Sequence, residues 1–338
     1  YIIVTTCCES DISGGLIKTD GNGEEEWVNE IISDVYFVNL ITQTNDGGYI
    51  TAGGYLAGQW NGGKRLSILI KSDVNGDTLW TKTYGDPLWG EEFRDVKQTT
   101  DNGYIACGTI QTDSINQTPP VQSLLVRKVD SSGFEEWNKI EDGGATFLSG
   151  FYAGGYSVEQ TIDGGYVICG RIRCSHNTSN WTDILVLKID SYGNTIWSRL
   201  FDGKGTHQTG DIGKCIKQTS DGGYIICGTA GISFSQWKDF YVLKIDSLGM
   251  KEWSQELHFG SAISEGFSVE QTTDGGYILC GYTRISGTYD MYVIKLSADG
   301  SATSSFSIPL YSNRKLEKVV DILGRDINPK KNHPFVEI

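Results

Sequence analysis

A short motif that recurs along the chain constrains its fold more than any other feature. The motif occupies residues 218–228, with the sequence QTSDGGYIICG, and close copies begin at Gln43, Gln98, Gln160 and Gln271. The first residues, YIIV, match the back half of the motif, and we interpret them as part of a sixth copy whose front half would lie upstream. Repeats of this kind each form one supersecondary unit. The chain is therefore predicted to be an array of similar units.

Each unit contains four segments with the character of β-strands. In the fourth unit these segments are 156–161, 166–170, 184–190 and 194–200. The first two are separated by Asp163-Gly164-Gly165, and the last two by Ser191-Tyr192-Gly193. Asp-Gly and Ser-x-Gly between such segments are hairpin signals, because glycine adopts a positive φ without a Cβ clash. Each unit is predicted to be a four-stranded antiparallel meander.

Units of this kind predict an all-β fold, namely a β-propeller. The chain has 43 Gly and 17 Tyr in 338 residues and no long stretch with apolar residues at helical spacing, so little helix is expected. Radial closure of four-stranded blades protects strand edges that a linear solenoid would expose. The recurring tyrosines and lysines count about six blades, the first of which lacks its innermost strand in this sequence. We predict a propeller over 1–309 and a short C-terminal tail over 310–338.

Spacing within the units divides each blade into a constant end and a variable end. The repeat Gln always precedes the repeat Tyr by 6 residues, and five repeat lysines precede the next repeat Trp by 9. By contrast, the step from Tyr to Lys varies from 17 to 24 residues, and that from Trp to Tyr from 22 to 29. If the strands are named A to D from the axis outwards, the A–B and C–D turns are constant and the B–C and D–A loops vary. Because function concentrates in variable loops, a ligand is expected on their face.

The candidate catalytic groups recur too regularly to indicate an active site. A catalyst needs a residue once, whereas the turn aspartates recur in every blade and are predicted to accept backbone amides of the turn. These are Asp46, Asp101, Asp163, Asp221 and Asp274. The four histidines share no metal-ligand spacing, and the sequence has no serine nucleophile elbow or phosphate loop. No catalytic, cofactor-binding or metal-binding residue is therefore predicted, and no cofactor is expected.

The eight cysteines do not form a disulfide framework by their spacing. Four of them follow the repeat Tyr by three residues, which predicts a small, buried strand position. They are Cys107, Cys169, Cys227 and Cys280. Cys215 lies on the strand expected to pair with that of Cys227, so a cross-strand disulfide is left open.

Charge and hydropathy exclude two classes of partner. Lys and Arg total 28 against 42 Asp and Glu, which gives a net charge of −14. Such a surface repels phosphate backbones, so a nucleic acid partner is not expected. No apolar segment approaches the roughly 18 to 20 residues that a membrane-spanning helix needs.

The segment 190–197, DSYGNTIW, and its counterparts ending at Trp80, Trp137 and Trp253 resemble the tryptophan-docking repeat of quinoprotein-type bacterial propellers. The present turn is one residue shorter and lacks the Thr before the Gly. The resemblance implies that one tryptophan on each outer strand packs against the neighbouring blade. These are Trp27, Trp80, Trp137, Trp197 and Trp253. Quinoprotein alcohol dehydrogenases also carry a vicinal disulfide, to which Cys7-Cys8 would correspond, but they resemble eight-bladed propellers, so that activity is not predicted.

The tail segment 316–326, LEKVVDILGRD, followed by NPKKN, resembles the start of a type IX secretion system sorting domain of Bacteroidota. The match covers about 25 residues and lacks the terminal strands of that family. It implies the type IX machinery as a partner and an extracellular or outer cell-surface location.

Aromatic residues outside the docking strands are the candidate ligand-binding residues, because exposed rings stack on sugars or anchor proteins. They are Trp60, Trp181 and Trp237 in B–C loops, Trp89 in a D–A loop, and Tyr289 near the equivalent place. The alternative is that they cap the ends of blades. We predict a secreted or cell-surface, non-catalytic binding or adhesion module for a glycan or a surface protein. The alternatives are an enzyme acting on extracellular polysaccharide and a structural subunit of a surface assembly.

Overall fold

The computed structural model of the chain contains β-strands and no helix in the part that it describes, so none of these residues forms a helix that could span a membrane. The described residues are 2–6, 14–31, 35–56, 65–86, 90–112, 121–141, 153–173, 182–203, 210–231, 238–258, 263–285, 288–309, 319–320 and 336–337. They fall into two compact units, Tyr1–Leu200 and Phe201–Ile338, which are described separately.

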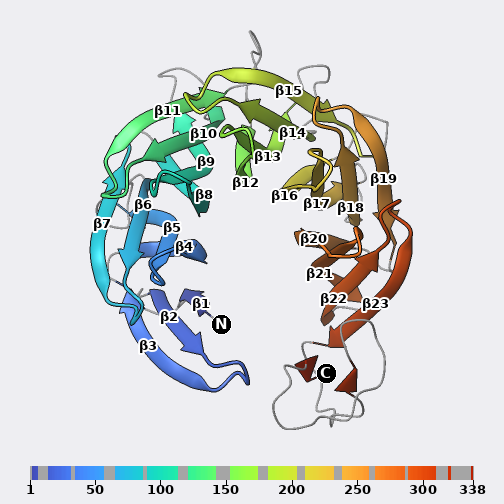
Figure 1. Ribbon diagram of the computed structural model, residues 1–338, viewed down its shortest axis with the longest axis horizontal. Helices are drawn as coiled ribbons and strands as arrows, with labels where there is room; N and C mark the ends of the chain where they lie inside the picture. Colours follow the sequence, from blue (N-terminus) through green and yellow to red (C-terminus); the bar gives the residue numbers. More distant parts are fainter. Residues whose placement is uncertain are drawn as a thin grey trace. The chain divides into compact units, whose positions relative to one another are not determined.

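The first unit contains four antiparallel sheets (Figure 1). The first sheet has three strands, β1 (Ile2–Thr6), β2 (Gly14–Thr19) and β3 (Glu25–Ile31). The second is formed by β4 (Val35–Gln43), β5 (Tyr49–Leu56), β6 (Arg65–Ser72) and β7 (Thr78–Tyr84). The third is formed by β8 (Gly90–Gln98), β9 (Tyr104–Thr112), β10 (Val121–Val129) and β11 (Glu135–Glu141). The fourth is formed by β12 (Ala153–Gln160), β13 (Tyr166–Arg173), β14 (Thr182–Ile189) and β15 (Thr195–Phe201).

The second unit contains two further four-stranded meanders. One consists of β16 (Ile212–Gln218), β17 (Tyr224–Gly231), β18 (Lys238–Ile245) and β19 (Lys251–Leu257). The other consists of β20 (Ile263–Gln271), β21 (Tyr277–Ile285), β22 (Thr288–Leu296) and β23 (Ala302–Pro309). One parallel residue pair, Lys238 with Ile263, links the two. In the tail, β24 (Val319–Val320) pairs with β25 (Val336–Glu337).

These meanders are the blades of a β-propeller, so the predicted fold class is confirmed. Within each unit the hydrophobic core lies between successive blades. One cluster, for example, joins Ile50 and Leu69 of the second sheet to Phe93 and Ile110 of the third. Burial of apolar side chains between sheets therefore holds neighbouring blades together.

The turn between the first two strands of a blade uses its Asp-Gly-Gly sequence in full. The Asp221 carboxylate accepts the Gly223 amide at 2.8 Å, as predicted for the repeat aspartates. Gly222 has a φ of 82°, and the equivalent Asn102 has 66°. Asn is the non-glycine residue that tolerates this conformation best, along with Asp. A Cβ on Gly223 would lie 2.6 Å from the Lys244 ammonium, so the second glycine makes room for a lysine.

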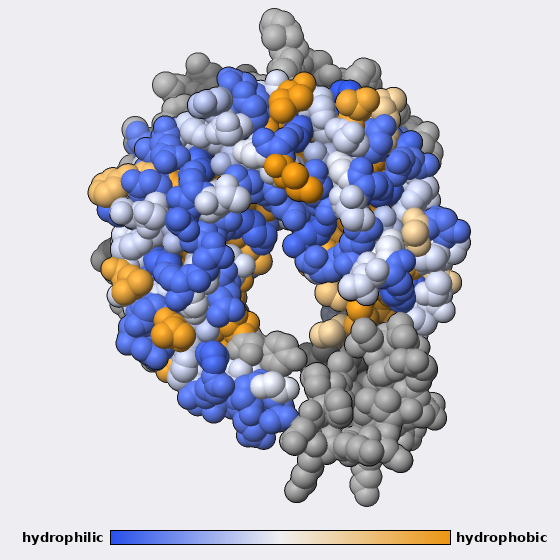
Figure 2. Space-filling view, viewed as in Figure 1, coloured by the Kyte–Doolittle hydropathy of each residue, from blue (hydrophilic) through white to orange (hydrophobic). Residues whose placement is uncertain are grey.

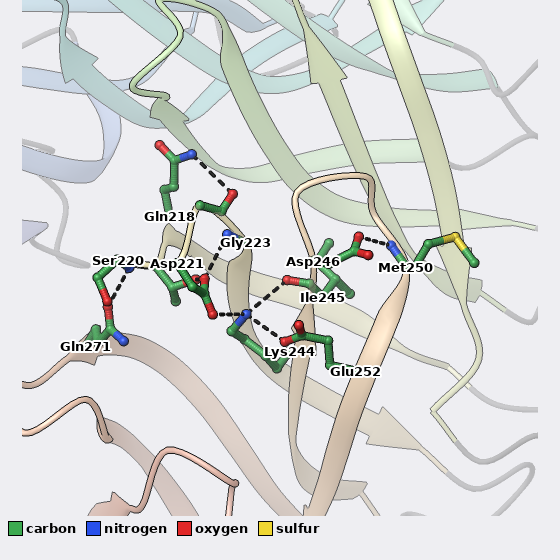
Figure 3. Close-up of polar contacts among 12 residues, drawn as sticks. Gln218, Ser220, Asp221, Gly223, Lys244, Ile245, Asp246, Met250, Glu252 and Gln271 are labelled. Atoms are coloured by element: carbon green, nitrogen blue, oxygen red, sulfur yellow. Dashed lines mark hydrogen bonds and ion pairs between the residues drawn. The ribbon is translucent and has the colours of Figure 1, made fainter.

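That lysine ties the turn to the third strand of the blade (Figure 3). The Lys244 ammonium is 2 % exposed and lies 2.9 Å from Asp221, 3.3 Å from the Ile245 carbonyl and 2.8 Å from Glu252. Equivalent lysines bind the turn aspartate of their own blade in every other four-stranded blade of the described chain. They are Lys71, Lys128, Lys188 and Lys295. A buried ammonium needs such partners, because leaving its charge unpaired away from water is costly.

The repeat glutamines Gln98, Gln160 and Gln271 each join their blade to the turn of the preceding blade in the same unit. Within the second unit, the Gln271 side-chain carbonyl accepts the Ser220 amide at 2.8 Å (Figure 3). Within the first unit, Gln98 accepts the Asn45 amide at 2.7 Å. A residue that recurs in every motif thus satisfies a backbone donor of the neighbouring blade.

The outer-strand tryptophans pack against the next blade wherever both blades lie in one unit. The Trp80 ring lies 5.9 Å from the Tyr104 ring, edge to face, and 3.0 Å from where a Cβ on Gly133 would be. The same pairing joins Trp27 to Tyr49, Trp137 to Tyr166 and Trp253 to Tyr277. The predicted wedge role is confirmed for these four, and it stays a prediction for Trp197.

Replacing one wedge should destabilise the protein far more than replacing its neighbour in the same strand. We expect Trp80→Ala to lower the free energy of unfolding by about 3 to 5 kcal/mol, because an indole is removed from between two blades. Leu79→Ala is the matched control, since Leu79 is 58 % exposed, and its effect should stay within about 0.5 kcal/mol. Chemical denaturation measures both, and equal losses would refute the wedge role.

The turn aspartates should make stability depend on acid. Burial alone would raise the pKa of Asp221, but hydrogen bonds from Thr219 and Lys244 lower it from 3.8 to about 2. A carboxyl with a lowered pKa stabilises the fold above its unfolded pKa and loses this contribution as the pH falls towards the folded value. We expect the melting temperature to hold down to about pH 4 and to fall between about pH 4 and pH 2.

Asp221→Asn should flatten this fall, because asparagine does not titrate. Asp77→Asn, at an exposed turn position, serves as the control and should leave the acid profile unchanged. Circular dichroism melts across this pH range measure both, and identical profiles for the two variants would contradict the assignment.

Candidate ligand-binding site

The first strand of each four-stranded blade carries a β-bulge at the same place. In β8 the register runs from Phe93 opposite Gly108 to Asp95 opposite Cys107, so Arg94 is the extra residue. The same shift falls four residues before the repeat glutamine in every such blade. The residues of this bulge row are Asn39, Arg94, Tyr156, Lys214 and Phe267. A bulge re-aims a side chain out of the regular ladder, so these five are free of the pleat that orders their neighbours.

A glycine on the second strand makes the bulge possible. A Cβ on Gly108 would lie 1.9 Å from the carbonyl oxygen of Glu92, which is closer than any real contact. The equivalent Gly228 and Gly281 meet a carbonyl oxygen at 1.9 and 2.0 Å. The Cys-Gly dipeptide that ends four copies of the motif therefore meets two separate structural requirements. A thiol fills the core, and the glycine accommodates the bulged strand.

Bulge-row residues of adjacent blades contact one another. In the first unit the Arg94 guanidinium lies 4.3 Å from the centre of the Tyr156 ring, and Arg171 approaches the same ring at 5.5 Å. In the second unit the Lys214 ammonium lies 3.8 Å from the centre of the Phe267 ring. Cations over aromatic faces are attracted by the ring quadrupole, so each pair orients its members. The bulge position, which lies outside the ladder, therefore varies between copies of the motif and carries polar, charged or aromatic side chains.

A polar pocket of about 440 Å³ opens beside Arg94 in the first unit. It is lined by Arg65, Gly90, Glu92, Arg94, Thr109, Gln111 and Gln122, and we call it the clamp pocket. Arg65 and Gly90 begin their strands and Gln111 lies near the end of β9. The pocket therefore lies at the end of the blades that bears the variable loops.

Two arginines converge on one carboxylate in the clamp pocket. Glu92 lies 3.1 Å from Arg65, which comes from the preceding blade, and 2.6 Å from Arg94 in its own strand. One carboxylate orients both guanidinium groups but neutralises only one positive charge. The group therefore carries one net positive charge, in a protein whose total charge is −14.

Some polar atoms that line the clamp pocket are buried without a hydrogen-bond partner among the described residues. The Thr109 hydroxyl and the Gln122 side-chain carbonyl are shielded from solvent and have no hydrogen-bond partner among the described residues. Thr109 is only 5 % exposed. Because a buried polar group without a partner costs free energy, such atoms indicate a place for a polar ligand or for water.

Of the five aromatic residues predicted to bind a ligand, one lies in the described part of the chain. Trp60, Trp89, Trp181 and Trp237 lie outside the described residues. Tyr289 is described, is 37 % exposed, and packs edge to face against Tyr282 with ring centres 5.1 Å apart. The residues that line the clamp pocket were not predicted. For Arg94 the available signal was its position four residues before the repeat glutamine, where the residue differs in every copy.

The structure describes five of the cysteines about which the sequence made a prediction. Cys107, Cys169 and Cys227 are fully buried, which confirms the small buried position, and Cys280 is partly buried. Cys215 is the register partner of Cys227, and both are thiols in this structure. Cys7 and Cys8 lie outside the described residues.

Two further groups of titratable residues have ordinary structural roles. Glu91, beside the clamp pocket in sequence, is buried, which raises its pKa, and it pairs with Arg127 at 3.3 Å. His258 accepts or donates a hydrogen bond with Asp239 at 2.8 Å and lies 3.7 Å from Glu256. The ligand atoms of this trio lie close enough to hold a metal ion, but the hydrogen bond alone accounts for the arrangement.

The surface seen in Figure 2 is mainly hydrophilic where the chain is described, with hydrophobic residues scattered singly. Single exposed apolar residues are normal on soluble proteins.

Comparison with known proteins shows similarity in fold. No family model and no curated protein matches the sequence. Two solved structures of an ulvan lyase, described as a new family of polysaccharide lyase, each match with a TM-score of 0.58 at 7 % identity over 90 % of this chain and 80 % of theirs. One of them is bound to -[GlcA(1-4)Rha3S]-. Hydrazine synthase of Kuenenia stuttgartiensis matches with a TM-score of 0.51 at 10 % identity, over 90 % of this chain and 42 % of that one.

The chain thus belongs by architecture among the β-propellers, in which unrelated activities occupy similar scaffolds. A polysaccharide lyase and a hydrazine synthase share this architecture at identities that relate folds only. The function must be argued from the site.

If the bulge row serves ligand binding rather than folding, its residues should be replaceable without loss of stability. We expect Arg94→Gln to change the free energy of unfolding by less than about 1 kcal/mol, because Arg94 lies outside the ladder. The adjacent Phe93 is fully buried, and Phe93→Ala should cost about 3 to 5 kcal/mol. Denaturant titrations of the two variants measure the contrast, and similar losses would show that Arg94 is a structural residue.

Proposed function

We propose that this protein binds an acidic polysaccharide and holds it in the clamp pocket. The observation that carries the proposal is the pair of arginines, Arg65 and Arg94, fixed on Glu92 in a pocket with unpartnered polar atoms. This is a glycan-binding module at the variable-loop end of the blades, as the sequence led us to expect, with different contact residues.

The chemistry of the clamp pocket suits an acidic sugar. A guanidinium is planar and offers paired donors that match a carboxylate or sulfate group. Thr109, Gln111 and Gln122 supply the hydroxyl and amide groups that sugar hydroxyls require. The volume lies within the roughly 300 to 1,000 Å³ typical of small-molecule sites, so a sugar unit fits.

A second candidate function is cleavage of the bound polysaccharide by elimination, which the similarity in fold to polysaccharide lyases supports. Elimination from a uronate needs a cation on the carboxylate, a base that removes the C5 proton, and a proton donor for the O4 that leaves as the C4=C5 double bond forms. Arg65 and Arg94 would supply the cation. Hydrolysis is less suited to the pocket, because it needs two carboxylates, and Glu92 is the one carboxylate among the described lining residues.

We also propose an extracellular or outer cell-surface location. The support is the resemblance of the tail to a type IX sorting domain, together with a ligand that occurs outside cells. Export through that machinery would be tested by whether fusing 310–338 to a reporter directs it to the cell surface.

Binding should depend on Arg94 and on acidic groups of the polymer. We expect the protein to bind galacturonan or a sulfated glucuronate–rhamnose polymer more tightly than neutral arabinan in isothermal titration calorimetry. Arg94→Gln should weaken binding at least tenfold, since a charge-assisted hydrogen bond contributes roughly 1.5 to 3 kcal/mol. Arg199→Gln removes a partly exposed arginine on an outer strand, away from the clamp pocket, and should leave binding unchanged.

The same mixtures distinguish binding from cleavage. Growth of the ultraviolet absorbance of an unsaturated uronate would identify a lyase, and its absence with intact binding would identify a binding module. Equal affinity for neutral and acidic polymers, or equal effects of the two arginine variants, would overturn the proposal.

A further inference from the structure

The last blade of the second unit repeats the clamp pocket position by position. Glu265 stands six residues before the repeat glutamine, as Glu92 does, and Lys238 stands six before the repeat lysine, as Arg65 does. The two ion pairs have the same length, since Lys238 lies 3.1 Å from Glu265 and Arg65 lies 3.1 Å from Glu92. The repeat therefore builds a carboxylate held by a cation of the preceding blade in two places.

The remaining positions of this second arrangement are aromatic or basic. Phe267, Tyr282 and Tyr289 occupy the places of Arg94, Thr109 and Gln122, and Arg284 occupies that of Gln111. These equivalences follow from counting from the repeat Gln, Tyr and Lys. We call Glu265, Phe267, Tyr282, Arg284 and Tyr289 the aromatic site.

The rings of the aromatic site are in mutual contact and open to solvent. The centres of Phe267 and Tyr282 lie 5.5 Å apart with their planes 30° from parallel, and Tyr289 meets Tyr282 edge to face. Phe267 is 46 % exposed and Tyr289 is 37 % exposed. The three rings thus form one contiguous aromatic surface, two members of which are open to solvent, and such a surface suits contact with a ligand.

Charged groups frame these rings. Lys214 and Lys238 both pair with Glu265. The Arg284 guanidinium lies 5.5 Å from the centre of the Tyr289 ring. Burial and the nearby Glu265 carboxylate raise the pKa of Tyr282 to about 12, so its hydroxyl keeps its proton at neutral pH. The Tyr282 hydroxyl is hydrogen-bonded to Glu265, so the site offers a ligand exposed rings and an excess of positive charge.

We propose that the aromatic site is a second carbohydrate-binding site, in which an acidic sugar packs against the exposed parts of the Phe267 and Tyr289 rings and pairs its acidic group with Arg284. The C–H face of a sugar ring is the ligand surface that matches exposed aromatic rings framed by hydrogen-bonding and charged groups. The site lies entirely in the second unit and does not require the clamp pocket. It extends the proposed function from one sugar contact to two.

Calorimetry of the intact protein with a short oligogalacturonide tests this second site. We expect two binding events in the unaltered protein, of which Phe267→Ala or Tyr289→Ala removes one and Arg94→Gln removes the other. The affected site should weaken at least about tenfold. Phe134→Ala is the matched control, because Phe134 is 62 % exposed and lies under the Lys82 ammonium at 4.1 Å, at a C–D turn. It should leave both events unchanged.

The outcomes separate the two proposals. A single event that depends on Arg94 and is indifferent to Phe267→Ala would overturn the aromatic site and leave the proposed function standing. An event that depends on Phe267 but survives Arg94→Gln unchanged would support the aromatic site against the clamp pocket. If Phe267→Ala instead lowers the melting temperature as Trp80→Ala does, or abolishes self-association in sedimentation, the rings serve folding or assembly and the inference is wrong.

Discussion

The structure depends on a buried lysine that ties the first turn of each blade to its third strand. Lys244 places an almost fully buried ammonium between Asp221, Glu252 and a backbone carbonyl. Its equivalents pair with the turn aspartate in each four-stranded blade of the described chain, and Lys128 also pairs with a glutamate, Glu136. Removing any partner would leave a charge or a carbonyl unsatisfied, so the turn aspartate, the second glycine and the lysine have to occur together. This explains why the spacing at this end of the blade does not vary.

Because these contacts fix the constant end of each blade, the sequence at the opposite end can vary without loss of the fold. The glutamine bonds and the tryptophan wedges also act near the constant turns, since Gln271 bonds Ser220 and Trp80 meets Gly133. The bulge lies farther along the first strand and contributes no ladder pairing, so its side chain is not needed for register. One scaffold can therefore present asparagine, arginine, tyrosine, lysine and phenylalanine at one position. The chemistry of the clamp pocket and of the aromatic site differs for that reason, although their frames match.

Local sequence predicted the blades well because hairpins are local. The strand pattern, the turn aspartates and the tryptophan wedges all depend on residues within one motif or on a recurrent partner. The lysines were recognised as repeat markers but not as ties, because Lys244 and Asp221 are far apart in sequence and meet only after the second and third strands pair. Arg94 was missed because a bulge is a property of cross-strand register, which composition and spacing do not encode. Of the aromatic residues predicted to bind a ligand, Tyr289 alone lies in the described chain, next to residues that were not predicted.

A protein with a negative net charge can bind an acidic polymer only where cations are concentrated at the binding site. The repeat lysines pair with their turn aspartates, so these cations add no net positive charge to the surface. In the two sites, by contrast, one carboxylate is shared by two cations, as Glu92 is by Arg65 and Arg94, which leaves one positive charge unbalanced. At physiological salt, charges farther than about 8 Å are largely screened. The net charge of the whole chain then matters less to a bound sugar than the pair of cations beside it, so an acidic chain is compatible with a site for an acidic glycan.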